Sequence, residues 1–417
     1  MVHDILILQK RELENKINER YIERKINLPE FNNSLIKVIM GPRRAGKSFL
    51  ALHILKNVGN FGYANFDDEK ILETKDYDEI INSLKTIYNN PKYFFFDEIQ
   101  NLPRWELFAN RLQRQGYKLI ITGSNSKLLS KELSTHLTGR HLEINVFPFS
   151  FKEYLTNFGE LTTAEKKEKL NTYLTFGGYP EPLINKINYN DYLKTLYDSI
   201  IYKDIIKRFN IRTPNAIEEI SKQLISNVAK EFSYTNLQKL TGLKNKVTIK
   251  KYVDYLEETF IFFKIEKFSY KIKEQIASNK KIYCIDNGFI HAKSFKISQD
   301  NGKLYENLVA IELKKKELNG EIELYFWKNN QGEEVDFLIR QGLEIKELIQ
   351  VCYDIKDIKT KEREIRALLK ASKDLKCKNL IILTQDYEAE EKNEWFGIKE
   401  KITYTPLIKW LQKETNV

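Results

Sequence analysis

The chain contains very little cysteine. Its three cysteines among 417 residues, Cys284, Cys352 and Cys377, lie far apart, and none has the CxxC spacing of a metal or redox motif. Disulfide-stabilised domains and cysteine-based zinc sites need several cysteines at short spacings. The sequence therefore argues against both, and it indicates an intracellular protein.

Long apolar runs are also absent. No stretch of 18 uncharged apolar residues occurs, whereas a membrane-spanning helix needs about 20. The first 30 residues mix charged and apolar side chains, unlike a signal peptide. No internal repeat or low-complexity linker divides the chain. We therefore expect a cytoplasmic protein with no membrane contact.

The composition is that of a large folded protein with a basic balance. Apolar residues make up 42% of the chain and the net charge is +10, and this length suggests two to four domains. A basic balance favours a polyanion such as nucleic acid as partner. A lysine-rich cytosolic protein without such a partner would have the same charge, so both interpretations stay open.

The first 148 residues alternate short apolar runs with helical segments. An amphipathic helix is predicted over 5–24 and a helix over 48–57, and strands are predicted at 35–40, 62–66, 93–96, 118–122 and 141–146. This alternation indicates βαβ units and a parallel sheet with helices on both faces. The chain then turns mainly helical over 150–230, and helices and strands mix after that.

A phosphate-binding motif follows the first predicted strand. The segment Gly41-Pro42-Arg43-Arg44-Ala45-Gly46-Lys47-Ser48 matches the P-loop (Walker A) pattern GxxxxGK[ST] and opens a predicted helix. Its glycines let successive N–H groups point at phosphate oxygens, and the helix N-terminus adds partial positive charge. Lys47 would neutralise the β- and γ-phosphates, and Ser48 would offer its hydroxyl to Mg²⁺. The motif predicts ATP and Mg²⁺ as ligands.

Two acidic residues end the third predicted strand. Asp97 and Glu98 follow the apolar run Tyr93-Phe94-Phe95-Phe96, as in a Walker B motif. This places Asp97 at the carboxyl edge of the sheet beside the P-loop, where it can hold Mg²⁺ through water. Glu98 is one residue further on and can orient or deprotonate an attacking water.

Asn125 and Arg140 are the remaining candidates for the ATPase site. The fourth predicted strand ends in Thr122-Gly123-Ser124-Asn125-Ser126, and between the P-loop strand and the acid strand its tip would face the γ-phosphate. Asn125, with Thr122 and Ser124 as alternatives, would sense that phosphate, unless the segment is an ordinary turn. Arg140 is either an arginine finger for a neighbouring subunit, which implies a homo-oligomer, or a surface arginine.

Taken in order, these motifs resemble archaeal and bacterial AAA-type ATPases with a C-terminal nuclease-like domain. The resemblance covers nearly the whole chain and implies an α/β fold whose core is a parallel P-loop AAA-type sheet. The implied parts are a helical lead-in (1–34), the ATPase core (35–148), a helical lid (149–230), a winged helix (231–300) and an α/β restriction-endonuclease-like domain (301–417). The matching segments are Gly41–Ser48, Phe96–Gln100, Gly123–Ser126, Leu137–Arg140, Pro148–Phe151, Gly177-Gly178-Tyr179-Pro180 and Glu334-Val335-Asp336.

The winged helix would carry a basic second helix. A first helix over 233–243 is predicted with Thr235 as its N-cap and a turn at Gly242, and strands are predicted at 261–268 and 281–285. The second helix, 245–258, carries Lys246, Lys250 and Lys251, and residues 235–300 hold thirteen lysines against seven acids. These three lysines would approach phosphates of double-stranded DNA. Alternatively the domain docks a protein, and its lysines are merely solvated.

The C-terminal domain matches an active nuclease only in part. The resemblance implies an acid, then a Glu or Gln, then a lysine two residues later, which together hold Mg²⁺ and activate water. Asp336 and Gln350 fit the first two positions, and Glu306 is a further candidate ligand. The lysine position holds Cys352, which cannot supply a positive charge. We therefore expect a degenerate domain rather than an active nuclease.

Three whole-protein functions fit these motifs. The first is a DNA-associated ATPase whose hydrolysis moves the lid and repositions the winged helix and nuclease-like domain. The second is a nucleotide-dependent signalling switch with a protein partner, and the third is an ATP-gated nuclease. We take the first as the prediction, because the P-loop set is complete and the winged helix is basic.

Overall fold

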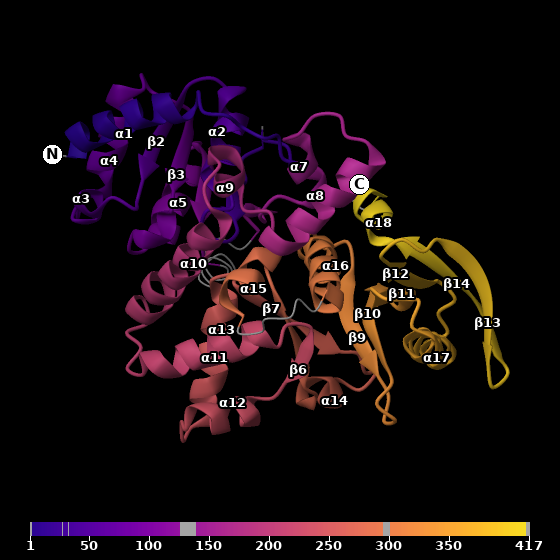
Figure 1. Cartoon of the computed structure of the whole chain (residues 1–417). Coiled ribbons are helices and arrows are strands. Elements are labelled where there is room, and N and C mark those ends of the chain that lie inside the picture. The colour runs from indigo at the N-terminus through magenta and orange to yellow at the C-terminus, as the bar shows by residue number, and fades with distance from the viewer. Residues whose placement is uncertain (1, 27, 32, 126–138, 295–300, 414–417) are drawn as a thin grey trace. The chain divides into compact units, whose positions relative to one another are not determined.

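The computed structural model describes residues 2–26, 28–31, 33–125, 139–294 and 301–413. The chain divides into two compact units. The first unit comprises Met1–Pro148 with Glu258–Phe260, and the second comprises Phe149–Glu257 with Ile261–Val417. Figure 1 labels the helices and strands of both, and each unit is described in turn.

The first unit is built on a parallel five-stranded sheet in the order β2-β3-β4-β1-β5. Strand β1 is buried along its whole length, which is typical of a strand in a sheet that is covered on both faces. The predicted parallel sheet is confirmed, and β4 lies between β1 and β3 as expected. The strands are β1 Ile36–Met40, β2 Phe61–Asn65, β3 Tyr93–Asp97, β4 Lys118–Gly123 and β5 His141–Asn145.

The helices of the first unit lie around this sheet (Figure 1), and their buried apolar residues share one core with those of the strands. They are α1 Val2–Lys16, α2 Lys47–Lys56, α3 Glu69–Leu72, α4 Tyr77–Ile87, the short 3-10 turn η1 Ile99–Asn101 and α5 Trp105–Arg114. The first helix is shorter than the predicted 5–24. It ends at Lys16, and the residues that follow contact other parts of the first unit. Tyr21 stacks on His53 at 3.5 Å between ring centroids, and Arg24 reaches the P-loop backbone.

The N-terminal part of the second unit is helical. Its elements are α7 Phe151–Thr156, α8 Thr163–Phe176, α9 Pro180–Asn185, α10 Tyr189–Ser199, the π-helical continuation η2 Ile200–Lys207 and α11 Pro214–Ser226. Reciprocal capping boxes begin α7 at Ser150 and α8 at Thr162. The Gly177-Gly178 break has a packing cause, because a Cβ on Gly177 would lie 1.7 Å from the Asp286 carboxylate, which accepts a hydrogen bond from the Gly178 N–H at 2.7 Å.

The rest of the second unit forms one nine-stranded sheet in the order β13-β14-β12-β11-β10-β9-β7-β8-β6. The strands β6 Lys230–Phe232, β7 Phe262–Lys267 and β8 Lys280–Cys284 are antiparallel neighbours. Strand β7 also pairs in parallel with β9, through Glu266 with Tyr325 and Lys267 with Phe326. Segments on both sides of residue 300 therefore share one hydrogen-bonded sheet.

Two helices precede the β7–β8 pair, as predicted. Helix α12, Tyr234–Thr241, ends at Gly242 in the left-handed conformation, and α13 follows at Lys246–Glu258. The predicted N-cap Thr235 is wrong. Ser233 caps α12 instead, because its hydroxyl lies three residues before Asn236 and accepts that N–H. The short helix α14, Ile272–Ala277, lies between the two strands, and α15 Asn287–Lys293 comes after them.

The C-terminal elements include a hairpin that the sequence pattern did not reveal. Strands β13 Ala389–Trp395 and β14 Ile398–Pro406 were missed because β13 is dominated by charged and polar residues, which conceal the apolar alternation of a strand. The other elements follow the predicted order. They are α16 Asn301–Leu318, β9 Glu323–Lys328, β10 Glu334–Gln341, β11 Glu344–Cys352, α17 Ile358–Leu375, β12 Leu380–Thr384 and α18 Leu407–Lys413.

Candidate nucleotide-binding site

The P-loop joins β1 to α2 through a backbone that glycine makes possible. Gly41 has φ +154° and Gly46 has φ +94°, conformations that side chains oppose. A Cβ at Gly41 would lie 1.9 Å from the carbonyl oxygen of Val146, at the end of β5. Gly46 precedes α2 and has no side chain to cap it. The N–H groups at this helix start are therefore available to an anionic ligand.

Lys47 and Ser48 open α2 and reach toward the acid strand. The Lys47 ammonium is buried, donates to the Pro42 carbonyl at 3.1 Å and lies 3.7 Å from Glu98 Oε1. The Ser48 hydroxyl donates to Asp97 Oδ1 at 2.8 Å. Two residues that are 49 apart in the sequence thus meet at the carboxyl edge of the sheet.

Asp97 lies buried at the end of β3. Besides Ser48, the Thr122 hydroxyl donates to Oδ1 and the Tyr63 hydroxyl donates to Oδ2 at 3.4 Å. Burial, together with the neighbouring Glu98 charge, raises the pKa of Asp97 despite these hydrogen bonds. A cation bound here would favour the charged carboxylate.

Glu98 is held in a network of its own. It has φ +51°, its N–H donates to the Thr122 hydroxyl at 3.0 Å, and its carboxylate accepts from Gln100 and from Ser124 at 3.1 Å. Burial by itself would raise the pKa of Glu98, but the Lys47 charge and the Gln100 hydrogen bond outweigh burial and hold it below its usual value. The carboxylate is therefore ionised at neutral pH, the state that a general base requires.

The structure places the other two predicted ATPase residues very differently. Asn125 is fully buried just beyond the carboxyl end of β4, and Thr122 and Ser124 beside it contact the two acids. Arg140 lies at the opposite edge of the sheet, before β5, and donates to Asn110 Oδ1 at 2.9 Å. It is thus not near the P-loop of its own chain. Of the motif residues, Ser126, Leu137 and Thr138 lie outside the described part.

Some residues at this site were not predicted from the sequence. Arg24 donates to the carbonyl oxygens of Ala45 at 3.0 Å and of Phe147, so it ties the P-loop to the end of β5. Gln100 and Tyr63 contact the two acids. Gln100 had a signal, because it lies two residues after Glu98, whereas Arg24 and Tyr63 belong to no motif.

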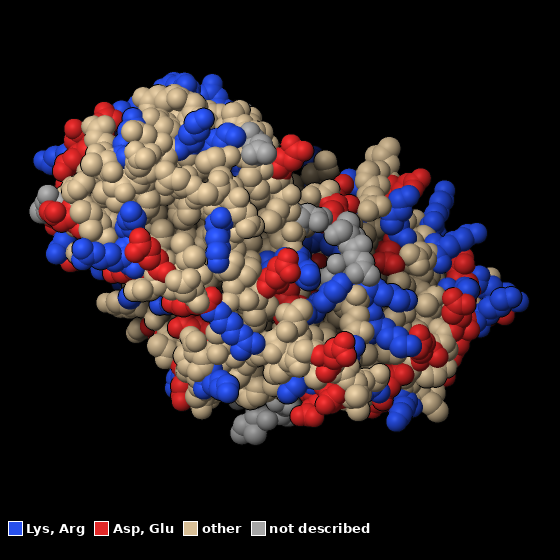
Figure 2. All heavy atoms as spheres, turned by 90° about the horizontal axis from the view of Figure 1, so that it is seen from above, with Lys and Arg blue, Asp and Glu red and all other residues tan. Residues whose placement is uncertain are grey.

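The three lysines predicted to contact DNA share one exposed face of α13. Lys246, Lys250 and Lys251 are all exposed, as is Val247 between them, and the Lys246 ammonium donates to the Thr235 hydroxyl at 3.0 Å. On the face of the molecule that Figure 2 shows, basic and acidic side chains are interspersed.

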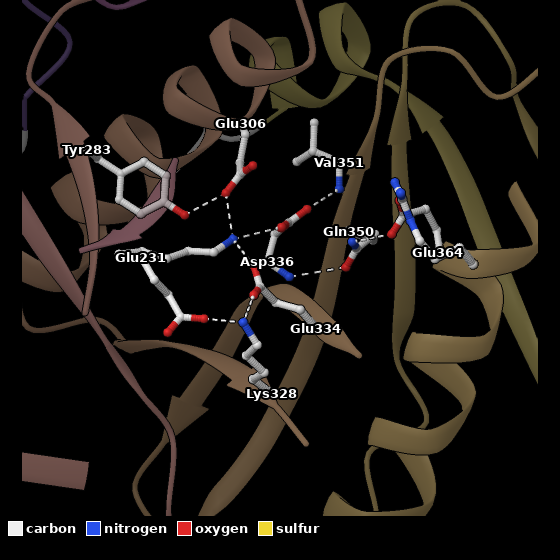
Figure 3. Close-up of polar contacts among 11 residues, drawn as sticks. Glu231, Tyr283, Glu306, Lys328, Glu334, Asp336, Gln350, Val351 and Glu364 are labelled. Carbon is white, nitrogen blue, oxygen red and sulfur yellow. Dashed lines mark hydrogen bonds and ion pairs between the residues drawn. The ribbon is translucent and has the colours of Figure 1, made fainter. Parts of the chain in front are cut away.

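The predicted nuclease-like residues do meet in the second unit (Figure 3). The Asp336 N–H donates to Gln350 Oε1 at 3.1 Å, and Glu306 points toward Asp336 from α16. Cys352 is buried, and burial raises the pKa of its thiol to about 12. In the described part of the chain, no group of three or more His, Cys, Asp or Glu residues is arranged to hold a metal ion. The sequence did not predict that Lys281 lies among these acids.

The parallel sheet, the P-loop and the adjoining acids define an AAA-type P-loop domain, and residues 33–155 match the family model described as an AAA domain. Residues 167–300 and 301–406 match models of two domains of unknown function, DUF8612 and DUF4143. The part of the chain that the structure describes contains no helix long and apolar enough to cross a membrane.

Two curated relatives match most of the chain. "Uncharacterized protein MJ1544" of Methanocaldococcus jannaschii is 38% identical over 97% of this chain and 94% of its own length. An uncharacterized protein of Haemophilus influenzae is 29% identical over 81% of this chain and 86% of its own. The chain therefore belongs to the same family as the M. jannaschii protein. Among solved structures, the Walker-type ATPase PABY2304 of Pyrococcus abyssi matches with 15% identity and a TM-score of 0.42, over 68% of this chain and 94% of its own.

Proposed function

We propose that the chain is an ATP-hydrolysing AAA-type ATPase that acts on double-stranded DNA. The observation that carries the ATPase part is the meeting of the P-loop and the acid strand, with Ser48 2.8 Å from Asp97 and Lys47 3.7 Å from Glu98. The phosphate-binding residues would be Gly41, Pro42, Arg43, Arg44, Ala45, Gly46, Lys47 and Ser48.

The residues at this edge fit Mg²⁺. The Ser48 hydroxyl and the Asp97 carboxylate are hard oxygen donors side by side, which this ion prefers. Burial raises the pKa of Asp97, and this penalty on the charged form would be relieved by a cation. When bound, Mg²⁺ would neutralise phosphate charge, with Ser48 and Asp97 holding it.

Hydrolysis would then depend on Lys47, Glu98 and their neighbours. Lys47 would leave its contact with Glu98 for the β- and γ-phosphates, because their negative charge exceeds that of one carboxylate. Glu98, ionised and still positioned by Gln100 and Ser124, would accept a proton from the attacking water. Asn125 would contact the γ-phosphate, and Arg140, far from its own P-loop, would act on the nucleotide of a neighbouring copy.

The DNA part rests on helix α13. Helices α11, α12 and α13 with the strands β6, β7 and β8 support a winged helix, in which α13 would enter a DNA groove. Lys246, Lys250 and Lys251 would contact phosphates from its exposed face. Movement of the helices over 149–230 with the nucleotide state would reposition the winged helix and the nuclease-like strands.

The test is the ATPase rate with and without double-stranded DNA at low and moderate salt. We expect DNA to raise the rate, and salt to remove the increase. A variant with Lys246, Lys250 and Lys251 replaced by alanine should lose the increase, and its DNA affinity should depend less steeply on salt, by about three in the logarithmic slope. The control removes the same charge from exposed lysines elsewhere, at Lys167, Lys373 and Lys378.

A rate indifferent to DNA in the wild type and in the control variant would contradict the DNA part and leave the ATPase part standing. That result would favour a nucleotide-dependent switch with a protein partner. No ATP hydrolysis under any condition would contradict the ATPase part itself.

A further inference from the structure

A lysine lies at the centre of the C-terminal acid cluster. Lys281, in β8, has 2% of its surface exposed. Its ammonium nitrogen lies 2.9 Å from Glu306 Oε1, 2.5 Å from Glu334 Oε1 and 3.0 Å from Asp336 Oδ1. Glu306, Glu334 and Asp336, here called the acid trio, point toward one another from α16 and β10 (Figure 3). One buried cation therefore contacts three carboxylates.

The oxygens that a metal would need are also engaged by protein groups. Asp336 Oδ2 accepts from the Val351 N–H at 3.0 Å, and Gln350 Oε1 accepts from the Asp336 N–H at 3.1 Å. The Gln350 amide nitrogen donates to Glu364. The side chains expected to bind Mg²⁺ thus make hydrogen bonds within the domain, which is the condition for keeping buried polar groups without a metal.

Charge explains why a cation is required here. Buried carboxylates without compensation are strongly destabilising. The Lys281 ammonium supplies this compensation, because it lies within 3.0 Å of an oxygen of each member of the acid trio. A second lysine, Lys328, lies 3.3 Å from Glu334 and also pairs with Glu231 at the rim of the cluster.

We infer that the Lys281 ammonium is the resident cation of the acid trio and stands in the place that a divalent metal ion would take in a nuclease. Mg²⁺ would need oxygen ligands at about 2.0–2.1 Å, and the ammonium already occupies the space between Glu306 and Asp336. Two cations would also repel each other in this buried volume. The acid trio is a different site from the ATPase site and from the lysines of α13.

The same contact has a structural consequence. Lys281 comes from β8, and the acid trio comes from α16 and β10, on the other side of residue 300. The ion pairs of Lys281 therefore connect strand β8 to α16 and β10, in addition to the hydrogen-bonded pairing of β7 with β9.

The experiment measures thermal unfolding of the full nucleotide-free chain in EDTA and in millimolar Mn²⁺. Every protein in it carries Asp97→Asn, so that the proposed Mg²⁺ site of the ATPase unit does not take Mn²⁺. The chain with this change alone serves as the wild type of the experiment, and its Tm should be the same in both solutions. Lys281→Met, which keeps the apolar bulk and removes the charge, should lower the Tm by on the order of 10 °C in EDTA. Mn²⁺ should restore part of this loss by drawing together the three carboxylates, which the described structure does not arrange to hold a metal ion while Lys281 lies among them. Lys280→Met is the matched control. Lys280 is the residue before Lys281 in β8, and it pairs with the partly exposed Glu266 and not with the acid trio. It should change the Tm little and show no response to Mn²⁺.

Several results would overturn the inference. One is a wild-type Tm that rises with Mn²⁺, and another is a Lys281→Met variant that either keeps the wild-type Tm or regains nothing with Mn²⁺. If that variant does not fold, paramagnetic resonance of Mn²⁺ with the wild type decides. We expect the same bound Mn²⁺ for wild type and Asp336→Asn. Extra Mn²⁺ bound by the wild type, or Mn²⁺-dependent DNA cleavage that Asp336→Asn abolishes, would show a working metal site instead.

Discussion

Replacing Gly41 with alanine should separate the geometry of the P-loop from its charge. The added Cβ would lie 1.9 Å from the Val146 carbonyl oxygen, and contacts of this kind are essentially never below 3.0 Å. The P-loop and the end of β5 would therefore have to move apart by roughly 1 Å, at a cost of about 1–3 kcal/mol in free energy of unfolding. The positive φ of Gly41 adds about 1–2 kcal/mol of strain.

This displacement should weaken nucleotide binding as well as stability. Losing one hydrogen bond between a backbone N–H and a phosphate costs about 1.5–3 kcal/mol, which corresponds to roughly 10- to 100-fold weaker binding of ATP. The measurements are titration calorimetry with ATP and urea unfolding. Gly59→Ala is the matched control, because Gly59 also has a positive φ, of +100°, but nothing lies within 4 Å of the added Cβ.

Gly59→Ala should show the strain alone, with ATP binding unchanged. Equal stability of the two variants, together with wild-type ATP affinity for Gly41→Ala, would refute the reasoning. It would mean that β5 does not hold the P-loop in the position described.

Three further predictions concern buried charges. Lys47→Ala should remove most of the ATP affinity, because the phosphates lose their cation, and calorimetry that finds wild-type affinity would contradict the site assignment. Glu98→Gln should bind ATP normally and hydrolyse it at least about 100-fold more slowly; unchanged turnover would make Glu98 a structural acid. Burial raises the pKa of Asp286 to about 7 from 3.8, so its contribution to stability is full below about pH 4 and declines as the pH rises to 7. Between about pH 5 and about pH 8, the free energy of unfolding of the wild type should fall by about 2–3 kcal/mol more than that of Asp286→Asn, as measured by urea unfolding. An equal change in the two proteins would be evidence against this.

The first unit was predictable because its signals are local. Strands β1, β3 and β4 contain short apolar runs, and the residues that matter lie at or just beyond the carboxyl ends of these strands, as Asp97 ends β3. Parallel pairing then brings these ends to one edge of the sheet. Arg24 shows the limit of such reasoning, since it approaches Phe147 from a segment with no regular pattern.

The C-terminal cluster was less predictable because its cation comes from far away in the chain. Lys281 and Asp336 are 55 residues apart, and they meet only because β7 pairs with β9. Sequence spacing led to position 352 for the missing lysine, where Cys352 stands. Lys281 comes from another strand and contacts Asp336, and nothing in the spacing of the motif indicates it.

The nine-stranded sheet joins two segments that match separate sequence families into one folded unit. Residues 167–300 and 301–406 match two different family models, so at the level of sequence they look like separable modules. The backbone hydrogen bonds between β7 and β9 and the contacts of Lys281 cross that boundary. A chain truncated at residue 300 would leave an unprotected sheet edge at β7 and a buried ammonium without its counter-ions. The two segments should therefore unfold in a single transition when the chain is heated.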